Sequence, residues 1–153
     1  MNIHNKLHSL GLALPQAAAA VADYVPATLS GNHIYVSGQL PFDHGKLIAE
    51  GKVPNPVSQE QACHASQQCA LNAIAAVDHV IDGDWSRFRR IVRVAVYVNS
   101  EATFTEQHLV ANGASELLGK IFGDAGRHVR AAVGVAALPL NAAVEVELQV
   151  EIT

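Results

Sequence analysis

The segment from Val144 to Ile152 alternates apolar and polar side chains without interruption. The apolar positions are Val144, Val146, Leu148, Val150 and Ile152, and the polar positions between them are Glu145, Glu147, Gln149 and Glu151. A repeat of two residues is the period of a β-strand, in which successive side chains point to opposite faces of the sheet. The segment therefore predicts a strand with one aliphatic face for a core and one acidic face outside it.

Further strands are predicted elsewhere in the chain. Residues 91–98 place Val92, Val94, Val96 and Val98 on one face, and Ile91, Arg93, Ala95 and Tyr97 on the other. Ala27–Leu29 and His33–Ser37 flank Ser30-Gly31-Asn32, which is typical of a hairpin turn. Arg130–Val135 predicts one more strand, closed by Leu138-Pro139.

Two long helices are indicated by their starts and their ends. Ser58–Gln61 has the spacing of a capping box, and helical periodicity continues to a stop before Gly83. Thr103–Glu106 has the same spacing at the start of a second helix, for which Gly123 is the predicted stop. The order of elements predicts an α+β fold, with a mixed and mostly antiparallel sheet and two long helices on one face.

The second face of the sheet is partly apolar, because Ile91, Ala95 and Tyr97 lie on it. A half-polar face of an antiparallel sheet is one explanation. We favour oligomerisation, in which a second copy of the chain covers this face.

Length and composition bound the class of protein. The 153 residues predict one domain, 1–153, with an N-terminal extension over 1–14 and a short helix from Pro15 through Ala17–Ala20. Half of the residues are hydrophobic, which excludes disorder, and the net charge of −4 argues against nucleic acid or an anionic membrane as partner. No apolar run reaches the roughly 20 residues of a membrane span. Cys63 and Cys69 are expected to be reduced thiols in a cytoplasmic protein.

The familiar catalytic and metal signatures are absent from the sequence, including the P-loop, GxSxG, HExxH and CxxC. The eight histidines are scattered, so we expect neither a metal site nor a cofactor. Arg87, Arg89, Arg90 and Arg93 form a basic cluster. We interpret it as a solvated start of a strand rather than as a phosphate or RNA contact.

Arg130 is the most informative charged residue. Alternation places it on one face with Ala132 and Gly134, whose small side chains leave space beside the guanidinium. The other face carries Ala131, Val133 and Val135, which suit a core.

Two roles for Arg130 remain open from the pattern. It can capture a carboxylate of a ligand through paired N–H donors. Alternatively, it forms a structural ion pair with Glu145 or Glu147. Ser37-Gly38-Gln39 is a second candidate, because a glycine near a strand end lets a ligand approach backbone N–H groups.

Several separated motifs resemble the RidA/YjgF family, also called the L-PSP endoribonuclease family. Its N-terminal part is similar to Tyr24-Val25-Pro26, Gly31-Asn32 and Ser37-Gly38-Gln39-Leu40-Pro41, and its C-terminal signature is similar to Arg130–Val133, Leu138-Pro139 and Val144–Glu147. The resemblance extends from about Leu12 to Ile152. Asn112–Ser115 and Gly126–Arg130 resemble a longer-chain branch of the family.

This resemblance implies a chorismate-mutase-like fold and a homotrimer with ligand clefts between subunits. It also implies metal-free hydrolysis of 2-imino acids and their enamine tautomers to 2-oxo acids and ammonia. By motif, Arg130 would hold the substrate carboxylate and Glu145 would position or activate water. Gly38 would offer a backbone contact, Tyr24 would line the cleft, and Ala132 stands where many members have a small residue or cysteine.

The sequence departs from the family at two places, and two other functions stay open. His128 stands where many members have a proline, and the longer second helix leaves Gln107 and His108 as candidates for the helix-borne polar residue of the pocket. A non-catalytic trimer that binds a small carboxylate metabolite or a protein is the first alternative. An endoribonuclease is the second, and the acidic net charge and the lack of paired histidines argue against it.

Overall fold

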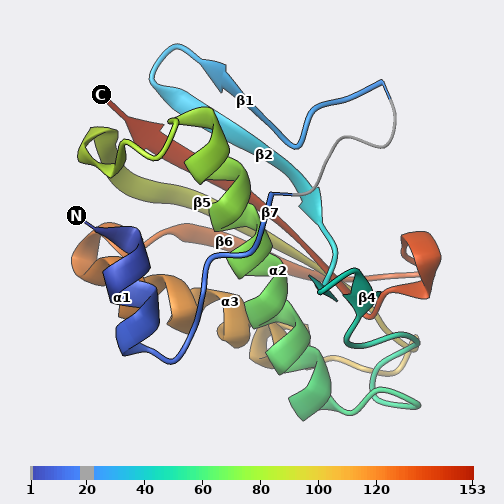
Figure 1. The fold of residues 1–153 in the computed structure, drawn as a ribbon. Coiled ribbons are helices and arrows are strands. Elements are labelled where there is room, and N and C mark those ends of the chain that lie inside the picture. The colour runs from blue at the N-terminus through green and yellow to red at the C-terminus, as the bar shows by residue number, and fades with distance from the viewer. Residues whose placement is uncertain (1, 18–22) are drawn as a thin grey trace.

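The computed structural model, which describes residues 2–17 and 23–153, places two long helices across one face of a mixed five-stranded sheet (Figure 1). The strand order is β1-β2-β7-β5-β6, and β6 runs parallel to β5 while the other pairs are antiparallel. The strands of this sheet are β1 Ala27–Ser30, β2 His33–Gln39, β5 Phe88–Asn99, β6 Val129–Val135 and β7 Val144–Ile152. A small hairpin joins β3 Phe42–Asp43 and β4 Lys46–Leu47. The predicted α+β class is confirmed.

The helices are α1 Ile3–Ser9, α2 Gln59–Val80 and α3 Gln107–Phe122, and short 3-10 turns cover Trp85–Arg87, Gly123–Gly126 and Pro139–Asn141. The α2 start is confirmed, because Ser58 Oγ accepts from the Gln61 N–H and Gln61 Oε1 accepts from the Ser58 N–H. These two bonds satisfy donors that a helix start otherwise leaves unpaired. The α2–α3 layer packs on β7 and β5, and the hydrophobic core lies between helices and sheet.

The start of α3 differs from the prediction. The proposed capping box at Thr103–Glu106 is wrong, because α3 begins at Gln107 and Glu106 makes no side-chain capping bond. Thr103 lies instead in a turn that is closed by the Phe104 N–H donating to the Glu101 carbonyl. The predicted stop is confirmed, since Gly123 has a left-handed φ of 60°.

The N-terminal segment also differs. Residues 15–17 are not helical, and the rest of the helix predicted over Ala17–Ala20 lies outside the described residues. The helix at this end is α1, which falls within the segment predicted as an extension. Ile3 and Leu7, one helical turn apart, bury their side chains in the core.

One bulge reassigns the faces of β5. Ile91 pairs with Val150 and Arg93 pairs with Gln149, so two steps on β5 oppose one step on β7. The extra residue turns Ile91 into the core, where it is 2% exposed, and leaves Val92 outside the core cluster. The predicted faces were therefore wrong at Ile91 and Val92.

The faces of β6 are the reverse of the prediction. Parallel pairing sets Ala131 beside Ala95 and Val133 beside Tyr97, on the face away from the helices. Val133 is 46% exposed, so the expected core role of Ala131, Val133 and Val135 was wrong. Ala132 packs against the core instead. The face away from the helices also exposes Tyr35 and Val129, and we call it the open face of the sheet.

Candidate functional site

The Arg130 side chain is held by one face of α3. Its register with Val94 on β5 turns it toward the helices, at the edge of the sheet. Nη1 donates to Asn112 Oδ1 at 3.0 Å and to Ser115 Oγ at 3.1 Å, and Nη2 donates to the His108 carbonyl at 3.3 Å. The three acceptors are uncharged, so they orient the guanidinium without neutralising it.

The alternative that Arg130 pairs with Glu145 or Glu147 is wrong. Both glutamates alternate with buried residues of β7, which places them on the open face. Within the described part of the chain, Arg130 takes part in no ion pair. A guanidinium has five N–H donors, and residues 2–17 and 23–153 accept from three of them, which leaves Nε–H and one Nη2–H for a ligand.

The helix-borne polar residue beside Arg130 is Asn112, which the sequence reasoning missed. His108, Asn112 and Ser115 follow one another at steps of four and three residues and so share one face of α3. His108 contributes only its carbonyl. Helical spacing within the Asn112–Ser115 motif is the signal that could have identified Asn112.

Gln107 lies at another place, beside Gly134. A Cβ built on Gly134 would be 2.5 Å from Ser100 Oγ and 2.8 Å from Gln107 Nε2. The space expected beside Gly134 is therefore filled by these two side chains.

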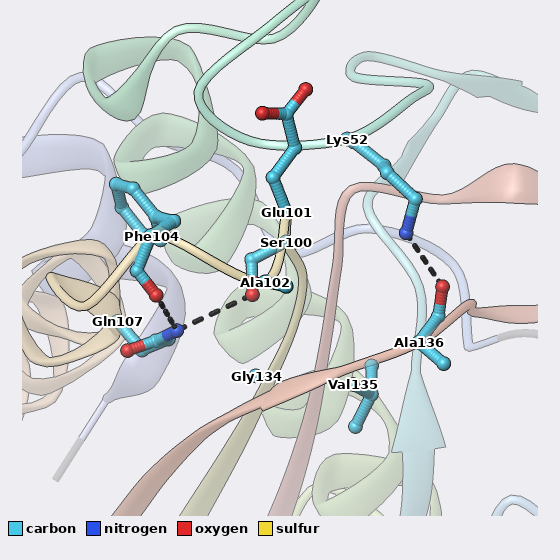
Figure 2. A pocket seen from close by; sticks show the side chains of 9 residues that line it. All are labelled: Lys52, Ser100, Glu101, Ala102, Phe104, Gln107, Gly134, Val135 and Ala136. Atoms are coloured by element: carbon cyan, nitrogen blue, oxygen red, sulfur yellow. Dashed lines mark hydrogen bonds between the residues drawn. The ribbon is translucent and has the colours of Figure 1, made fainter.

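A pocket of about 700 Å³ adjoins this point (Figure 2). In it Gln107 Nε2 donates to the Phe104 carbonyl at 2.7 Å, and Lys52 Nζ donates to the Ala136 carbonyl at 2.6 Å. Lys52 Nζ also donates to Asn99 Oδ1 at 3.0 Å. The pocket is thus braced by hydrogen bonds to neutral acceptors, two of them donated by the Lys52 ammonium, and it lies four residues along β6 from Arg130.

His128 continues the set of contacts behind Arg130. Its Nε2 lies 2.9 Å from Ser115 Oγ, and its Nδ1 lies 2.7 Å from the Gly126 carbonyl oxygen. We call Arg130, Ala132, Asn112, Ser115 and His128 the arginine half-site.

Glu145 and Gly38 lie together on the open face. The register of β2 against β7 shifts between Val36 and Gln39, so Gly38 falls in a bulge. A Cβ on Gly38 would collide with Glu145 Oε1, which shows that the carboxylate rests directly on the glycine backbone. Burial raises the pKa of the half-buried Glu145 carboxyl, and the neighbouring Glu147 raises that pKa further.

Tyr24 reaches the same region through the segment that precedes β1. The Ser37 N–H donates to the Pro26 carbonyl at 2.9 Å, and Ser37 Oγ donates to the Val25 carbonyl at 2.7 Å. Tyr24 is 53% exposed beside this segment. We call Tyr24, Gly38 and Glu145 the glutamate half-site. In one copy of the chain it lies across the sheet from the arginine half-site.

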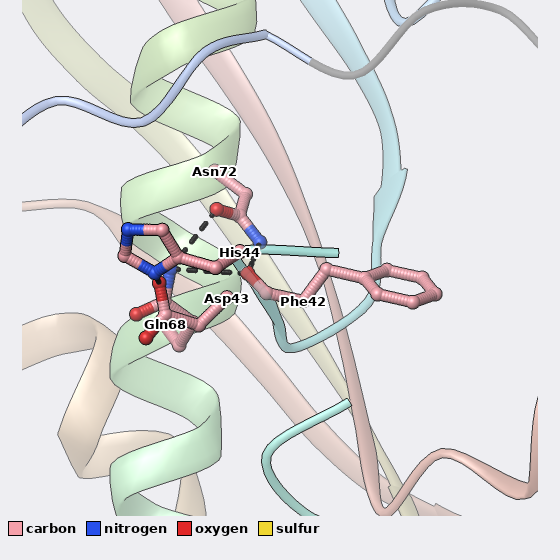
Figure 3. A network of polar contacts seen from close by, with 5 residues as sticks. All are labelled: Phe42, Asp43, His44, Gln68 and Asn72. Carbon is pink, nitrogen blue, oxygen red and sulfur yellow. Dashed lines mark hydrogen bonds and ion pairs between the residues drawn. The ribbon is translucent and has the colours of Figure 1, made fainter. Parts of the chain in front are cut away.

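The chain after Gly38 is fixed to α2 by two amide side chains (Figure 3). Asn72 Nδ2 donates to the Leu40 carbonyl at 3.0 Å and to the Phe42 carbonyl at 2.9 Å, and Gln68 Nε2 donates to the Phe42 carbonyl at 3.2 Å. These bonds tie the β3–β4 hairpin to the core layer and so limit the movement of the bulge that carries Gly38.

Arg90 of the basic cluster forms an ion pair with Glu151 at 2.7 Å. Within residues 2–17 and 23–153, no three His, Cys, Asp or Glu side chains gather in a group that could hold a metal ion. No helix of that described chain is long and apolar enough to cross a membrane.

Comparison with known proteins gives the class. Residues 4–152 match the family described as "YjgF/chorismate_mutase-like, putative endoribonuclease". Protein TCP17 of Trypanosoma cruzi is 43% identical over 147 residues, which cover 95% of this chain and 91% of that protein. The chain therefore belongs to the RidA/YjgF family and has its chorismate-mutase-like fold.

Two solved structures place the chain within that family. Atu1372 from Agrobacterium tumefaciens, described as of unknown function, has a TM-score of 0.92 and 46% identity over 99% of this chain and 94% of that one. RidA from an Antarctic Psychrobacter has a TM-score of 0.59 and 29% identity over 90% and 94%. The chain is thus more similar in structure to Atu1372 than to this RidA.

Proposed function

We propose that the protein is a homotrimer that hydrolyses 2-imino acids in clefts between its subunits. The main support for this proposal is that, among the described residues, Arg130 keeps two free N–H donors and has no carboxylate partner. Glu145 lies on the opposite face of the sheet. A cleft that uses both residues must combine the arginine half-site of one copy with the glutamate half-site of another. Contacts of this head-to-tail kind generate closed rings when the rotation from one copy to the next closes, as it does in a trimer.

The open face supports assembly. Tyr35, Val129 and Val133 are exposed there at 46%, 66% and 46%. Covering such apolar side chains with a second copy removes them from water, which favours association.

Two thiols that form no disulfide, Cys63 and Cys69, suit the reducing cytoplasm as the place of this assembly.

The chemistry follows from the two half-sites. Nε–H and Nη2–H of Arg130 bind the substrate carboxylate as a pair. Glu145, made more basic by its raised pKa, takes a proton from water as the water oxygen bonds to C2 of the protonated imine. The product of this addition is a carbinolamine, which carries a hydroxyl and an amino group on C2. Its C–N bond then breaks as the C2 hydroxyl becomes a carbonyl. The hydroxyl proton and the proton held by Glu145 both leave with the NH2 group, giving a 2-oxo acid and ammonium, the protonated form of ammonia.

The remaining candidates shape the cleft. Gly38 brings backbone beneath the Glu145 carboxylate, Ala132 is a small neighbour of Arg130 on β6, and Tyr24 supplies an exposed ring to line the opening. No thiol chemistry is assigned to the Ala132 position.

A coupled assay tests the proposal. An amino-acid oxidase acting on alanine generates 2-iminopropanoate in solution, and ammonia release is followed with and without the protein. We expect acceleration over the spontaneous rate, and loss of that acceleration in Arg130→Ala. No acceleration with imines from several amino acids would overturn the hydrolase. Binding of 2-oxobutanoate without turnover would favour the non-catalytic metabolite-binding trimer, and cleavage of RNA by nuclease-free protein would favour the endoribonuclease.

A further inference from the structure

We propose that Ser115 and His128 are positioning residues that orient the Arg130 guanidinium through a chain of hydrogen bonds. This inference rests on the proposed function, in which Arg130 binds a carboxylate. The chain runs from the Gly126 carbonyl through the His128 ring and the Ser115 hydroxyl to Arg130 Nη1, with contacts of 2.7, 2.9 and 3.1 Å.

The direction of each bond follows from the chemistry of its two ends. The Gly126 carbonyl only accepts, so His128 Nδ1 carries the hydrogen of that bond. In the neutral ring, Nε2 is then the bare nitrogen and accepts from the Ser115 hydroxyl. With its hydrogen directed at His128, Ser115 Oγ presents lone pairs to Arg130 Nη1. His128 therefore sets the orientation of the hydroxyl that receives the arginine.

The far end of the chain is itself fixed to α3. Gly126 is buried, and a Cβ added there would collide with the Leu118 carbonyl oxygen. The loop after α3 thus packs backbone against backbone, and the Gly126 carbonyl is a rigid anchor for His128. Ser115 and Asn112, three residues apart on α3, then receive both hydrogens of Nη1.

These hydrogen bonds determine which N–H groups of Arg130 remain for a ligand. With both Nη1 hydrogens used within the chain, a ligand can bind only through Nε–H and the remaining Nη2–H. Without the Ser115–His128 bond the hydroxyl can rotate, and Nη1 loses a fixed acceptor. The guanidinium then samples other orientations, and part of the binding free energy is spent on selecting the right one.

Two pairs of variants test the chain against simple packing. His128→Leu fills the volume without an acceptor, whereas His128→Gln keeps an acceptor at the place of Nε2. Ser115→Ala removes the hydroxyl and Ser115→Thr retains it. His79→Gln, at an exposed position of α2, is the control. The probe is 2-oxobutanoate, with its Kd measured by calorimetry and with kcat and KM measured on 2-iminopropanoate.

We expect His128→Leu and Ser115→Ala each to raise Kd and KM about two- to twelvefold, the range for one net hydrogen bond, with kcat nearly unchanged. His128→Gln and Ser115→Thr should recover most of the affinity. The double variant Ser115→Ala, His128→Leu should lose no more than the larger single loss, because the residues act in series.

The outcomes separate the two proposals. If the wild type binds 2-oxobutanoate and His128→Leu binds equally well, the positioning role is wrong and the proposed function stands. If His128→Gln loses as much affinity as His128→Leu, packing rather than hydrogen bonding explains the effect, and the positioning role is again wrong. If the wild type neither binds nor hydrolyses, the proposed function fails and this inference fails with it.

Discussion

The arginine half-site joins the edge strand β6 to α3, whereas the glutamate half-site joins β2 to the central strand β7. Arg130 carries a permanent charge and is surrounded by neutral acceptors from α3. Glu145 has an adjustable charge, and its surroundings disfavour that charge through burial and a like-charged neighbour. The arginine half-site therefore controls the orientation of a permanent charge. The glutamate half-site controls the proton affinity of a carboxyl group.

This difference shows how one sheet can carry two kinds of chemistry. An arginine keeps its proton in any protein environment, so hydrogen bonds are the means left to tune it. A carboxyl group can be tuned by desolvation, and Glu145 is half-buried on β7, which lies between β2 and β5 in the middle of the sheet. The edge and the centre of the sheet thus suit the binding group and the base respectively.

The largest effect is expected from Glu145→Gln, which keeps the shape of the side chain and removes the base. Loss of a general base lowers rate about 10²- to 10⁴-fold, so kcat on 2-iminopropanoate should fall in that range. Binding of 2-oxobutanoate should stay nearly the same, because the carboxylate is held by Arg130. A variant that keeps the wild-type kcat would show that Glu145 is not the base.

Arg130→Ala should affect binding first. Truncating one partner of a desolvated charge pair costs roughly 2–5 kcal/mol, which corresponds to a loss of about thirtyfold to several thousandfold in kcat/KM. Melting temperature and oligomeric state should be retained, because the Arg130 side chain lies outside the buried core.

Arg127→Ala is the matched control for this variant, since Arg127 is an exposed arginine three residues away that pairs with Asp124. It should leave both binding and turnover unchanged. An Arg130→Ala variant that melts early and still hydrolyses imines at the wild-type rate would end the role of Arg130 as the carboxylate anchor.

Gly38→Ala tests the close approach at the bulge. The added Cβ collides with Glu145 Oε1, so the carboxylate must move off the glycine backbone. Displacing a reacting group by about 1 Å can cost up to about a hundredfold in rate, and we expect kcat to fall by tenfold or more. Gly119→Ala on α3 has open space around it and should instead stabilise the protein by about 1 kcal/mol. Equal kcat in Gly38→Ala and the wild type would show that the contact has no catalytic consequence.

Sequence reasoning succeeds where a pattern is strong and local. The unbroken alternation of Val144–Ile152 predicts β7 to the residue, and the Ser58–Gln61 spacing predicts the start of α2. The contrast between apolar and polar positions permits only a strand in the first segment. The capping chemistry permits only a helix start in the second.

The faces of β5 and β6 could not be predicted in this way. The bulge at Ile91–Arg93 inserts one residue with no marker in the sequence, and it inverts the faces on its N-terminal side as far as a second register shift between Phe88 and Arg90. On β6, the valines beside Ala131 indicate a core face, but the register with β5 turns that face away from the helices.

The partners of Arg130 depend on the same register. Asn112 and Ser115 meet Arg130 only once β6 is turned toward α3. The separation of Arg130 from Glu145 across the sheet also follows only from the two registers together. The motif resemblance identifies both residues as candidates. The strand registers, which the motifs do not contain, place the two side chains on opposite faces of the sheet in one copy of the chain.

The smallest expected effect concerns the stability of the folded chain. The pKa of Glu145 is raised in the folded protein, first by burial and then by Glu147, so folding favours the protonated carboxyl. Its stabilising contribution is complete below the unfolded-state pKa of about 4.3 and is lost as pH rises through the raised folded value. Above the raised folded value the wild type therefore carries a half-buried charge that Glu145→Gln lacks.

Glu145→Gln should accordingly melt at a higher temperature than the wild type at pH 7, and the two melting curves should converge as pH falls toward 4. Glu116→Gln, at an exposed position on α3, should follow the wild type throughout this range. Convergence would establish that the folded protein disfavours the charge of the glutamate half-site, whereas hydrogen bonds to neutral acceptors orient the charge of the arginine half-site. A Glu145→Gln variant that melts below the wild type at pH 7 would mean that the ionised carboxylate is stabilised in the folded protein, and the contrast between the half-sites would not hold.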